Sequence, residues 1–581
     1  MKIPLKRYWA LLATYLRPQR ARVGLLAGLL LLNIGLELLN PQIVRYFIDT
    51  ALAGGALETL AVAAGAFIGI ALVTQGLNVW ATYLSENIAW TATNALRLDL
   101  TAHCLRLDLS FHKARTPGEL IERIDGDVNA LANFFSQFVI HLLGNLILIG
   151  GVLALLFGID WRVGLTMTAF VVLALVILIR IRGVAGAYWT RVRQVSAEFF
   201  GFLGEHLAGT EDTRANGATG YVLRRFHELI QGWWPVDRRA SLAGYSMWMT
   251  TLGVFAVGTA LAFGLGAYLW SVGAISLGTV YIIFNYTELL SRPIEQIRTQ
   301  LEDLQRADAG IARVEELRGI RSRLAEGAGA ALPAGPLGVA FDDVTFGYEA
   351  DDPVLRDLSF DLPPGTVLGL LGRTGSGKTT LARLLLRLYD PTTGQIRLGG
   401  VPIAGAHLRD LRRHVGLVTQ DVQLFQASVR DNLTFFNRAI PDAQILAVLD
   451  DLGLRGWYDS LPAGLDTELD ADGGGLSAGE AQLLAFVRIF LADPGLVILD
   501  EASSRLDPAT EQLIERAVSK LLRDRTGIII AHRLGTIGRA DRIMILEDGR
   551  ILEQGDRRRL ADDPRSRFSR LLQTGLEEVL A

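Results

Sequence analysis

The sequence predicts a multidomain membrane protein, in which a six-helix, all-α transmembrane domain precedes an α/β domain. Three observations support this fold class. Six apolar runs fill the first half of the chain, an Ala-, Gly- and Pro-rich stretch follows them, and a phosphate-loop motif stands between a predicted strand and a predicted helix.

The composition is consistent with a membrane protein. Of 581 residues, 50% are hydrophobic and only 20% are charged, and the mean hydropathy is +0.30, which is unusually apolar for a soluble chain. The net charge of -4 gives no global basic field that would attract nucleic acid. The single cysteine, Cys104, excludes an intrachain disulfide framework and a cysteine metal cluster.

The apolar runs are each close to the ~20 residues that a bilayer core of ~30 Å requires. They lie at 23–48, 57–84, 134–158, 160–182, 249–270 and 275–292. A buried soluble helix is the alternative for any one run, but six such runs with few acidic residues favour membrane spans. The basic segment before the first run lacks a small-residue cleavage site, so that run is predicted to be a retained helix.

Basic residues gather before the first run, between the second and third runs, and between the fourth and fifth. The alternate connections, at 51–57, 159–162 and 271–276, are short, and Arg162 is their single basic residue. This asymmetry predicts that both termini are cytoplasmic. The long basic connections have helical periodicity and are predicted to be cytoplasmic helical extensions. Each contains a Gly/Thr-rich turn, at 113–119 and 209–220, which could face another domain.

Two carboxylates interrupt the apolar runs, Glu37 in the first and Glu288 in the last. Ionisable groups are unfavourable in lipid, so we expect them to face the bundle interior, a water-filled cavity or a partner helix. They are candidate cavity residues, and hydrogen bonding between helices is the alternative.

The predicted domain boundaries follow from composition. Residues 1–318 form the transmembrane domain, and residues 319–338, rich in Ala, Gly and Pro, form a linker. Residues 339–581 alternate short β-rich runs with helical ones, which is typical of an α/β domain.

Residues 372–379 (GRTGSGKT) match the phosphate-loop pattern, between a strand predicted at 367–371 and a helix predicted at 380–388. The glycines let backbone N–H groups close around phosphate oxygens at a helix N-terminus. The predicted ATP-binding residues here are Gly372, Arg373, Thr374, Gly375, Ser376, Gly377, Lys378, Thr379 and Thr380. Lys378 is expected to reach the β- and γ-phosphates, and Thr379 to bind Mg²⁺.

A second predicted strand, 496–499, ends in Asp500 and Glu501. This pattern fits a Mg²⁺-binding carboxylate followed by one that orients or deprotonates water. The pair alone is weak evidence, but together with the phosphate loop it is strong.

Residues 476–480 (LSAGE) resemble the LSGGQ signature of ABC ATPases, and the rest of that family's motifs are present in order. By this resemblance Tyr348 stacks on adenine, and Gln420 binds the metal and contacts the membrane domain. Asp507 belongs to the D-loop, and His532 contacts the γ-phosphate. The preceding helices, with FHKARTPGELIERIDGDV at 111–128, resemble the exporter half-transporters.

The resemblance implies a dimer that holds two ATP molecules at its interface, with a second half-transporter as partner. Each site joins one chain's phosphate loop to the other chain's signature, here Ser477, Ala478, Gly479 and Glu480. The implied catalytic residues are Glu501, His532 and Gln420, and the implied Mg²⁺ ligands are Thr379, Gln420 and Asp500. Dimer closure and hydrolysis would drive alternating access, with the two Gly/Thr-rich turns as coupling helices, because ATP must favour the closed state to shift its population.

Departures from the family pattern cluster around the signature. Ala478 adds a methyl group, and Glu480 puts an anion near a triphosphate unless it turns outward. Ala471 stands where the family has a glutamate, and Arg505 replaces a D-loop alanine. The groups for the chain's own ATP are intact, so this pattern resembles one subunit of a heterodimeric exporter and implies that this chain supplies the catalytic glutamate. A homodimer that tolerates LSAGE is the alternative.

The leading functional prediction is ATP-driven export across the cytoplasmic membrane, with a multi-pass transmembrane domain and the ATPase domain in the cytoplasm. An ATP-gated conduit or regulator is the rival, although Glu501 and His532 favour turnover. The apolar runs disfavour a soluble ABC protein acting on nucleic acid. The fusion of both domains disfavours an importer, and the sequence does not identify the cargo.

Overall fold

The computed structural model describes residues 13–137, 144–349, 351–420, 422–470, 476–500, 508–531 and 537–574. The chain divides into two compact units. One comprises Met1–Leu105 and Pro117–Ile320, and the other comprises Arg106–Thr116 and Arg321–Ala581. They are described separately below and are called the helical unit and the nucleotide unit.

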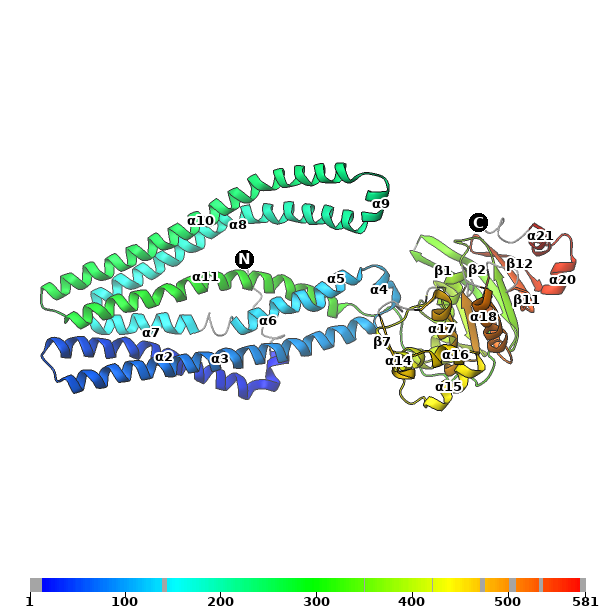
Figure 1. Cartoon of the computed structure of the whole chain (residues 1–581), viewed down its shortest axis with the longest axis horizontal. Coiled ribbons are helices and arrows are strands. Elements are labelled where there is room, and N and C mark those ends of the chain that lie inside the picture. The colour runs from blue at the N-terminus through cyan, green and yellow to red at the C-terminus, as the bar shows by residue number, and fades with distance from the viewer. Residues whose placement is uncertain are drawn as a thin grey trace. The chain divides into compact units, whose positions relative to one another are not determined.

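The helical unit consists of long helices that run beside one another (Figure 1). Its elements are η1 (Arg17–Gln19), α2 (Arg20–Leu52), α3 (Leu57–Arg106), α5 (Pro117–Ile121), η2 (Glu122–Gly126), α6 (Asp127–Gln137), α7 (Gly144–Ile159), α8 (Trp161–Ala208), α9 (Thr210–Ala215), α10 (Thr219–Ser271) and α11 (Leu277–Gly319). Several helices continue far beyond the apolar runs, as the periodicity predicted.

Among the described residues, four helices are long and apolar enough to cross a membrane: Ala13–Leu52, Leu57–Arg106, Trp161–Leu178 and Thr219–Ser271. Gly144–Ile159 is a shorter apolar helix, and the sixth predicted run, 275–292, begins two residues before α11 and otherwise falls within it. Apolar membrane helices are therefore present, while the count of six stays a prediction.

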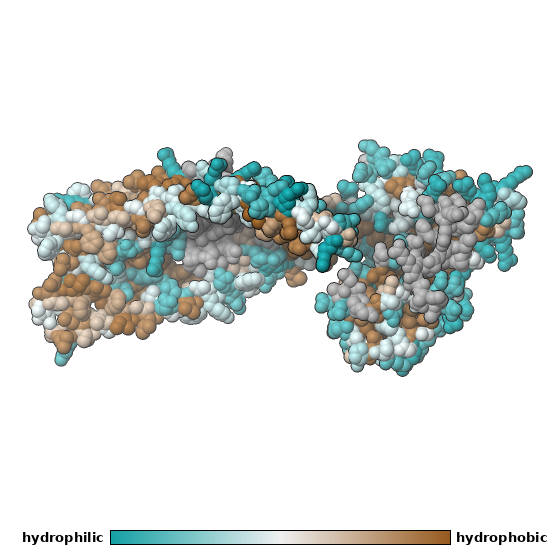
Figure 2. All heavy atoms as spheres, turned by 45° about the horizontal axis from the view of Figure 1, so that its top comes forward, coloured by the Kyte–Doolittle hydropathy of each residue, from teal (hydrophilic) through white to brown (hydrophobic). Residues whose placement is uncertain are grey.

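The helical unit is apolar inside and outside. Val152, Met167, Ala262 and Ile282 are fully buried where α7, α8, α10 and α11 pack. Many large apolar side chains are nevertheless exposed, such as Val62, which is 72% exposed on α3. Figure 2 shows hydrophobic side chains spread over the surface of these helices. A helix that is apolar all round is typical of a membrane span.

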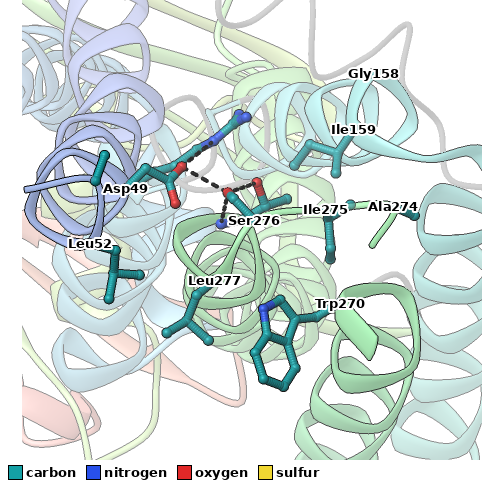
Figure 3. A pocket seen from close by; sticks show the side chains of 12 residues that line it. Asp49, Leu52, Gly158, Ile159, Trp270, Ala274, Ile275, Ser276 and Leu277 are labelled. Carbon is teal, nitrogen blue, oxygen red and sulfur yellow. Dashed lines mark hydrogen bonds and ion pairs between the residues drawn. The ribbon is translucent and has the colours of Figure 1, made fainter. Parts of the chain in front are cut away.

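A polar clasp joins the end of α2 to the start of α11 (Figure 3). The carboxylate of Asp49 accepts hydrogen bonds from the Ser276 hydroxyl at 2.8 Å and from the Gly278 N–H at 2.9 Å. Ser276 is also the N-cap of α11, and it accepts from the Thr279 N–H. Arg45 Nε lies 3.7 Å from Asp49, and the clasp lines a cavity of about 770 Å³.

The nucleotide unit contains a four-stranded antiparallel sheet in the order β2-β1-β4-β5. Its strands are β1 (Val339–Glu349), β2 (Asp352–Leu362), β4 (Thr393–Leu398) and β5 (Val401–Pro402). A six-stranded sheet has the order β12-β11-β3-β10-β9-β6. Its strands are β3 (Val367–Leu371), β6 (Val415–Val418), β9 (Leu496–Asp500), β10 (Thr526–Ile530), β11 (Arg542–Glu547) and β12 (Arg550–Asp556). Neighbouring strands are parallel except for β12.

The other elements of this unit are short helices and a small two-stranded sheet. They are α4 (Leu109–Lys113), α12 (Lys378–Leu385), η4 (Ile403–Gly405), α13 (Leu408–His414), β7 (Ala427–Ser428), α14 (Val429–Thr434), α15 (Asp442–Asp451), α16 (Arg455–Asp459), η5 (Gly464–Asp466), β8 (Glu468–Leu469), α17 (Ala478–Ala492), α18 (Pro508–Leu521), α20 (Arg557–Asp562) and α21 (Arg567–Thr574). The predicted α/β pattern is therefore confirmed.

The six-stranded sheet has a hydrophobic core on each face. Along β9, Val497 and Leu499 belong to one core, and Leu496 and Ile498 belong to the other. Successive strand residues point to opposite faces, so a strand covered on both sides reads as a continuous apolar run. This is why 496–499 could be recognised as a strand from sequence.

The segment Arg106–Thr116 leaves the helical unit and belongs to the nucleotide unit. Asp108 is the N-cap of α4 and accepts hydrogen bonds from the N–H groups of Ser110 and Phe111. Its other oxygen accepts from the Arg323 N–H at 2.6 Å. Burial opposes ionisation of Asp108, but these hydrogen bonds outweigh it and hold the pKa of its carboxyl below the usual value.

Candidate ATP-binding site

The phosphate loop follows β3 and leads into α12. This helix begins at Lys378, two residues before the predicted start, and ends at Leu385 rather than at 388. Gly377, its N-cap, has φ +103°, and a Cβ there would lie 2.4 Å from Leu355 Cδ2. Gly372 has φ +148°, and its Cβ would lie 2.3 Å from the Leu546 carbonyl oxygen. Only glycine fits these two positions, so the loop can bring its N–H groups close to an anion.

Two polar side chains are buried within the loop. The Lys378 ammonium donates to the carbonyl oxygens of Gly372 at 2.5 Å and Arg373 at 2.9 Å. Ser376 is 4% exposed, and its hydroxyl has no hydrogen-bond partner among the described residues. A buried hydroxyl without a partner is unfavourable, and a phosphate oxygen would satisfy it. The loop therefore fits a phosphate chain.

Oxygen ligands for a metal meet at the same edge of the sheet. Thr379 Oγ1 donates to Asp500 Oδ2 at 3.2 Å, although β3 and β9 are separated by β10. Gln420, which follows β6, lines the same cavity of about 650 Å³. Hydroxyl, carboxylate and amide oxygens, with phosphates and water, are what Mg²⁺ prefers. The structure thus brings together three residues that the sequence proposed as ligands.

Tyr348 lines this cavity from β1 and is held on several sides. Its hydroxyl lies 3.1 Å from Thr380 Oγ1 and accepts from Arg383 Nη1 at 2.9 Å. The ring meets Tyr389 edge to face, with centroids 5.2 Å apart. Lys113 Nζ lies 4.0 Å from the ring centroid. The base-stacking residue proposed from sequence is therefore a fixed aromatic surface.

Sequence reasoning missed the two cations around Tyr348. Arg383 gave no signal, because no pattern shows which side of α12 faces β1. Lys113 did give one, since it opens the first Gly/Thr-rich turn, which was predicted to face another domain.

The signature segment begins α17 through a capping box. Ser477 accepts from the Glu480 N–H at 3.2 Å, and the Ser477 N–H donates to Glu480 Oε2 at 2.7 Å. Ala478 and Gly479 form the first turn between them. Glu480 therefore bends back onto the helix N-terminus and does not turn outward. The Ser-x-x-Glu spacing is a known sign of this motif and could have predicted it.

Arg488 fixes the same helix to the segment that follows Gln420. Its guanidinium is buried and donates to the carbonyl oxygens of Asn432 at 2.7 Å and Gln423 at 3.0 Å. It also lies 4.6 Å from the Phe435 ring centroid. Burial lowers the pKa of Arg488 to about 10. Sequence reasoning missed this residue too, because an arginine on a helix is ordinarily a surface residue.

Several proposed residues lie outside the described part of the chain. They are Glu501, Asp507 and His532, together with the substituted positions Ala471 and Arg505. The strands that precede Glu501 and His532, β9 and β10, are neighbours in the sheet, and β10 lies next to β3. The roles inferred from the resemblance stay predictions.

The two cavity candidates lie on separate helices of the helical unit. Glu37 is half-buried on α2 and accepts a hydrogen bond from Asn33 Nδ2 at 3.2 Å. Glu288 is exposed on α11. Their roles as cavity residues stay predictions.

A phosphate loop, a hydroxyl–carboxylate pair and a fixed aromatic ring, carried by the same chain as apolar helices, define an ATP-binding membrane protein. Residues 23–294 match the family model for the ABC transporter transmembrane region, and residues 355–504 match the ABC transporter model. The chain belongs to the ABC transporter family. It is an exporter-type half-transporter that spans the membrane several times and couples ATP hydrolysis to transport.

Relatives match over most of the chain. It is 32% identical to a fatty acid ABC transporter ATP-binding/permease protein of Mycobacterium tuberculosis, covering 86% of this chain and 78% of that one. It is 29% identical to an ATP-dependent lipid A-core flippase of Alcanivorax borkumensis, covering 85% of each. Among solved structures, a bacterial Atm1-family ABC exporter with ATP bound aligns with a TM-score of 0.80 and 26% identity, over 96% of this chain and 98% of that chain.

Proposed function

We propose that this protein is one half of an exporter that moves an amphipathic, lipid-like molecule by alternating access. The ATP-binding constellation of Lys378, Thr379 and Asp500, in one chain with apolar helices, carries the proposal for ATP-driven transport. The relatives named for fatty acid and lipid A-core support the class of cargo.

The proposed chemistry divides among the residues at the sheet edge. Lys378, Ser376 and the loop N–H groups bind the phosphates, and Tyr348 stacks on the adenine. Thr379, Asp500 and Gln420 hold Mg²⁺, which neutralises charge on the transferred phosphoryl group. Glu501 orients the attacking water, and His532 contacts the γ-phosphate.

We further propose a heterodimer in which this chain supplies the catalytic glutamate. The Glu480 carboxylate lies at the N-terminus of α17, where the helix dipole and free N–H groups would otherwise favour a phosphate. Two anions at one helix end repel each other, so this signature is a weak partner for another chain's ATP. The second half-transporter would then supply the intact signature. A homodimer remains the alternative, because Ser477 and Gly479 are retained.

The cargo pathway is proposed to include Glu37 and Glu288. Asn33, Glu37 and Asn40 lie at i, i+4 and i+7 on α2, so they share one face of the helix. Asn33 is 7% exposed, and its Oδ1 has no partner among the described residues. A polar face within a membrane helix suits contact with a polar head group.

Transport by reconstituted vesicles tests the proposal. The chain, with its partner subunit, is reconstituted so that the nucleotide units face outward, and a fluorescent fatty acid or phospholipid is added. We expect MgATP to drive accumulation against a gradient, and Lys378→Ala and Glu501→Gln to abolish it. An ATP-dependent leak that only dissipates gradients would instead support the gated conduit.

A further inference from the structure

Lys113 stands out because it is an exposed cation placed over the ring proposed to receive adenine. Its ammonium nitrogen lies 4.0 Å from the Tyr348 ring centroid. Both residues belong to the nucleotide unit, yet Lys113 comes from the segment Arg106–Thr116, which directly continues α3. The contact therefore links the base platform to a segment that is continuous with a membrane helix.

Tyr348 lines two cavities. The phosphate loop, Arg383 and Tyr348 line the first, of about 650 Å³. Lys113, Asp108 and Tyr348 line the second, of about 500 Å³. Tyr348 thus contributes to both cavities, and Lys113 lines only the one that contains no phosphate-loop residue. A base that enters with its phosphates would use the first cavity and leave the Lys113 contact in place.

Two kinds of contact hold the Tyr348 ring: hydrogen bonds to its hydroxyl, and the Lys113 ammonium over its face. Thr380 and Arg383 fix the hydroxyl. A cation above an aromatic face is attracted by the ring's quadrupole and limits tilting of the ring. Lys113 is itself placed by α4, whose N-cap Asp108 is bonded to the Arg323 N–H.

We propose that Lys113 is a positioning residue for base recognition: it holds Tyr348 in the stacking orientation, so that docking of Arg106–Thr116 strengthens ATP binding. Linkage requires the reverse as well, so a bound base strengthens the docking of this segment by the same factor. The inference rests on the assignment of Tyr348 as the adenine platform.

A double-mutant cycle tests the proposal in the full-length transporter. Displacement of a fluorescent ATP analogue is measured with ATP and with inorganic tripolyphosphate, which has no base. Lys113→Met is expected to weaken ATP binding about two- to five-fold, the range of an exposed cation–π contact. It should leave tripolyphosphate binding unchanged, Lys113→Arg should restore ATP binding, and Arg106→Gln, at an exposed cation of the same segment, should have no effect.

The Tyr348→Ala background separates the possible failures. There, Lys113→Met should no longer change ATP affinity. A loss that persists in this background, an equal loss for tripolyphosphate, or no loss at all would overturn the proposal. If Tyr348→Ala alone leaves ATP affinity unchanged, the platform assignment fails, whatever Lys113 does.

Discussion

At the start of α17, the side chains of Ser477 and Glu480 each accept a hydrogen bond from the other residue's backbone N–H. Substituting these residues one at a time therefore distinguishes the structural effect of the cap from the electrostatic effect of the carboxylate. Gln serves as well as Glu at the third position of a capping box. Glu480→Gln keeps the hydrogen bonds of the cap, so it should lower the apparent melting temperature less than Ser477→Ala, which loses about 1 kcal/mol of capping. Scanning fluorimetry of the purified chain measures both, with Glu480→Ala as the capping control.

The same variants test the charge argument. If the Glu480 anion repels a phosphate, Glu480→Gln should increase the stabilisation that MgATP gives to the assembled transporter. Glu480→Ala removes the charge too, so it should share this gain despite its weaker cap. An unchanged response to MgATP in both variants would mean that the carboxylate does not affect the site.

Residues differ in how far the sequence reveals them. Lys378, Thr379 and Asp500 could be placed because a strand, a glycine loop and a helix dictate where their side chains lie. The Glu480 cap was also readable, from its spacing to Ser477. Arg383 and Arg488 could not be predicted, since their roles depend on which distant segment packs against each helix.

At the scale of elements, the clasp between α2 and α11 depends on the absence of a side chain at Gly278. A Cβ there would lie 2.6 Å from Asp49 Oδ1 and 2.7 Å from the Arg45 carbonyl oxygen. Gly278→Ala should therefore push the helix ends apart and destabilise the helical unit by about 1–3 kcal/mol, the usual range for overpacking.

Gly264 provides the matched control, because a Cβ there meets nothing within 4 Å. Gly264→Ala, inside α10, should be neutral or mildly stabilising, since alanine favours helices over glycine by up to about 1 kcal/mol. Thermal unfolding in lipid nanodiscs measures both variants. Equal melting temperatures for the two would show that the clasp tolerates a methyl group.

Elements with a strong local pattern could be predicted from the sequence. A segment that packs into the other unit of the chain, as Arg106–Thr116 does, could not be predicted. The buried strands β3 and β9 and the long helices follow from apolar runs and periodicity. Arg106–Thr116 belongs to the nucleotide unit through contacts with residues far along the chain, such as the hydrogen bond from the Arg323 N–H to Asp108, 215 residues apart. No local pattern encodes a contact at that separation.

At the scale of the whole molecule, the sequence retains the residues that the family pattern predicts for the chain's own ATP, whereas the signature predicted to serve a partner's ATP is altered. Fold and family could be predicted from the sequence because the motifs and apolar runs are local. The partner could not, because a dimer interface depends on a second surface. Only the activity of defined assemblies decides between a heterodimer and a homodimer.

We expect the purified chain, reconstituted alone in lipid, to hydrolyse ATP slowly. Restoring the consensus signature with Ala478→Gly and Glu480→Gln should raise this activity several-fold, because each chain could then complete the other's site. Glu501→Gln in the restored chain should abolish the gain. Robust Glu501-dependent turnover by the unaltered chain would contradict the heterodimer and show that LSAGE supports hydrolysis in a homodimer.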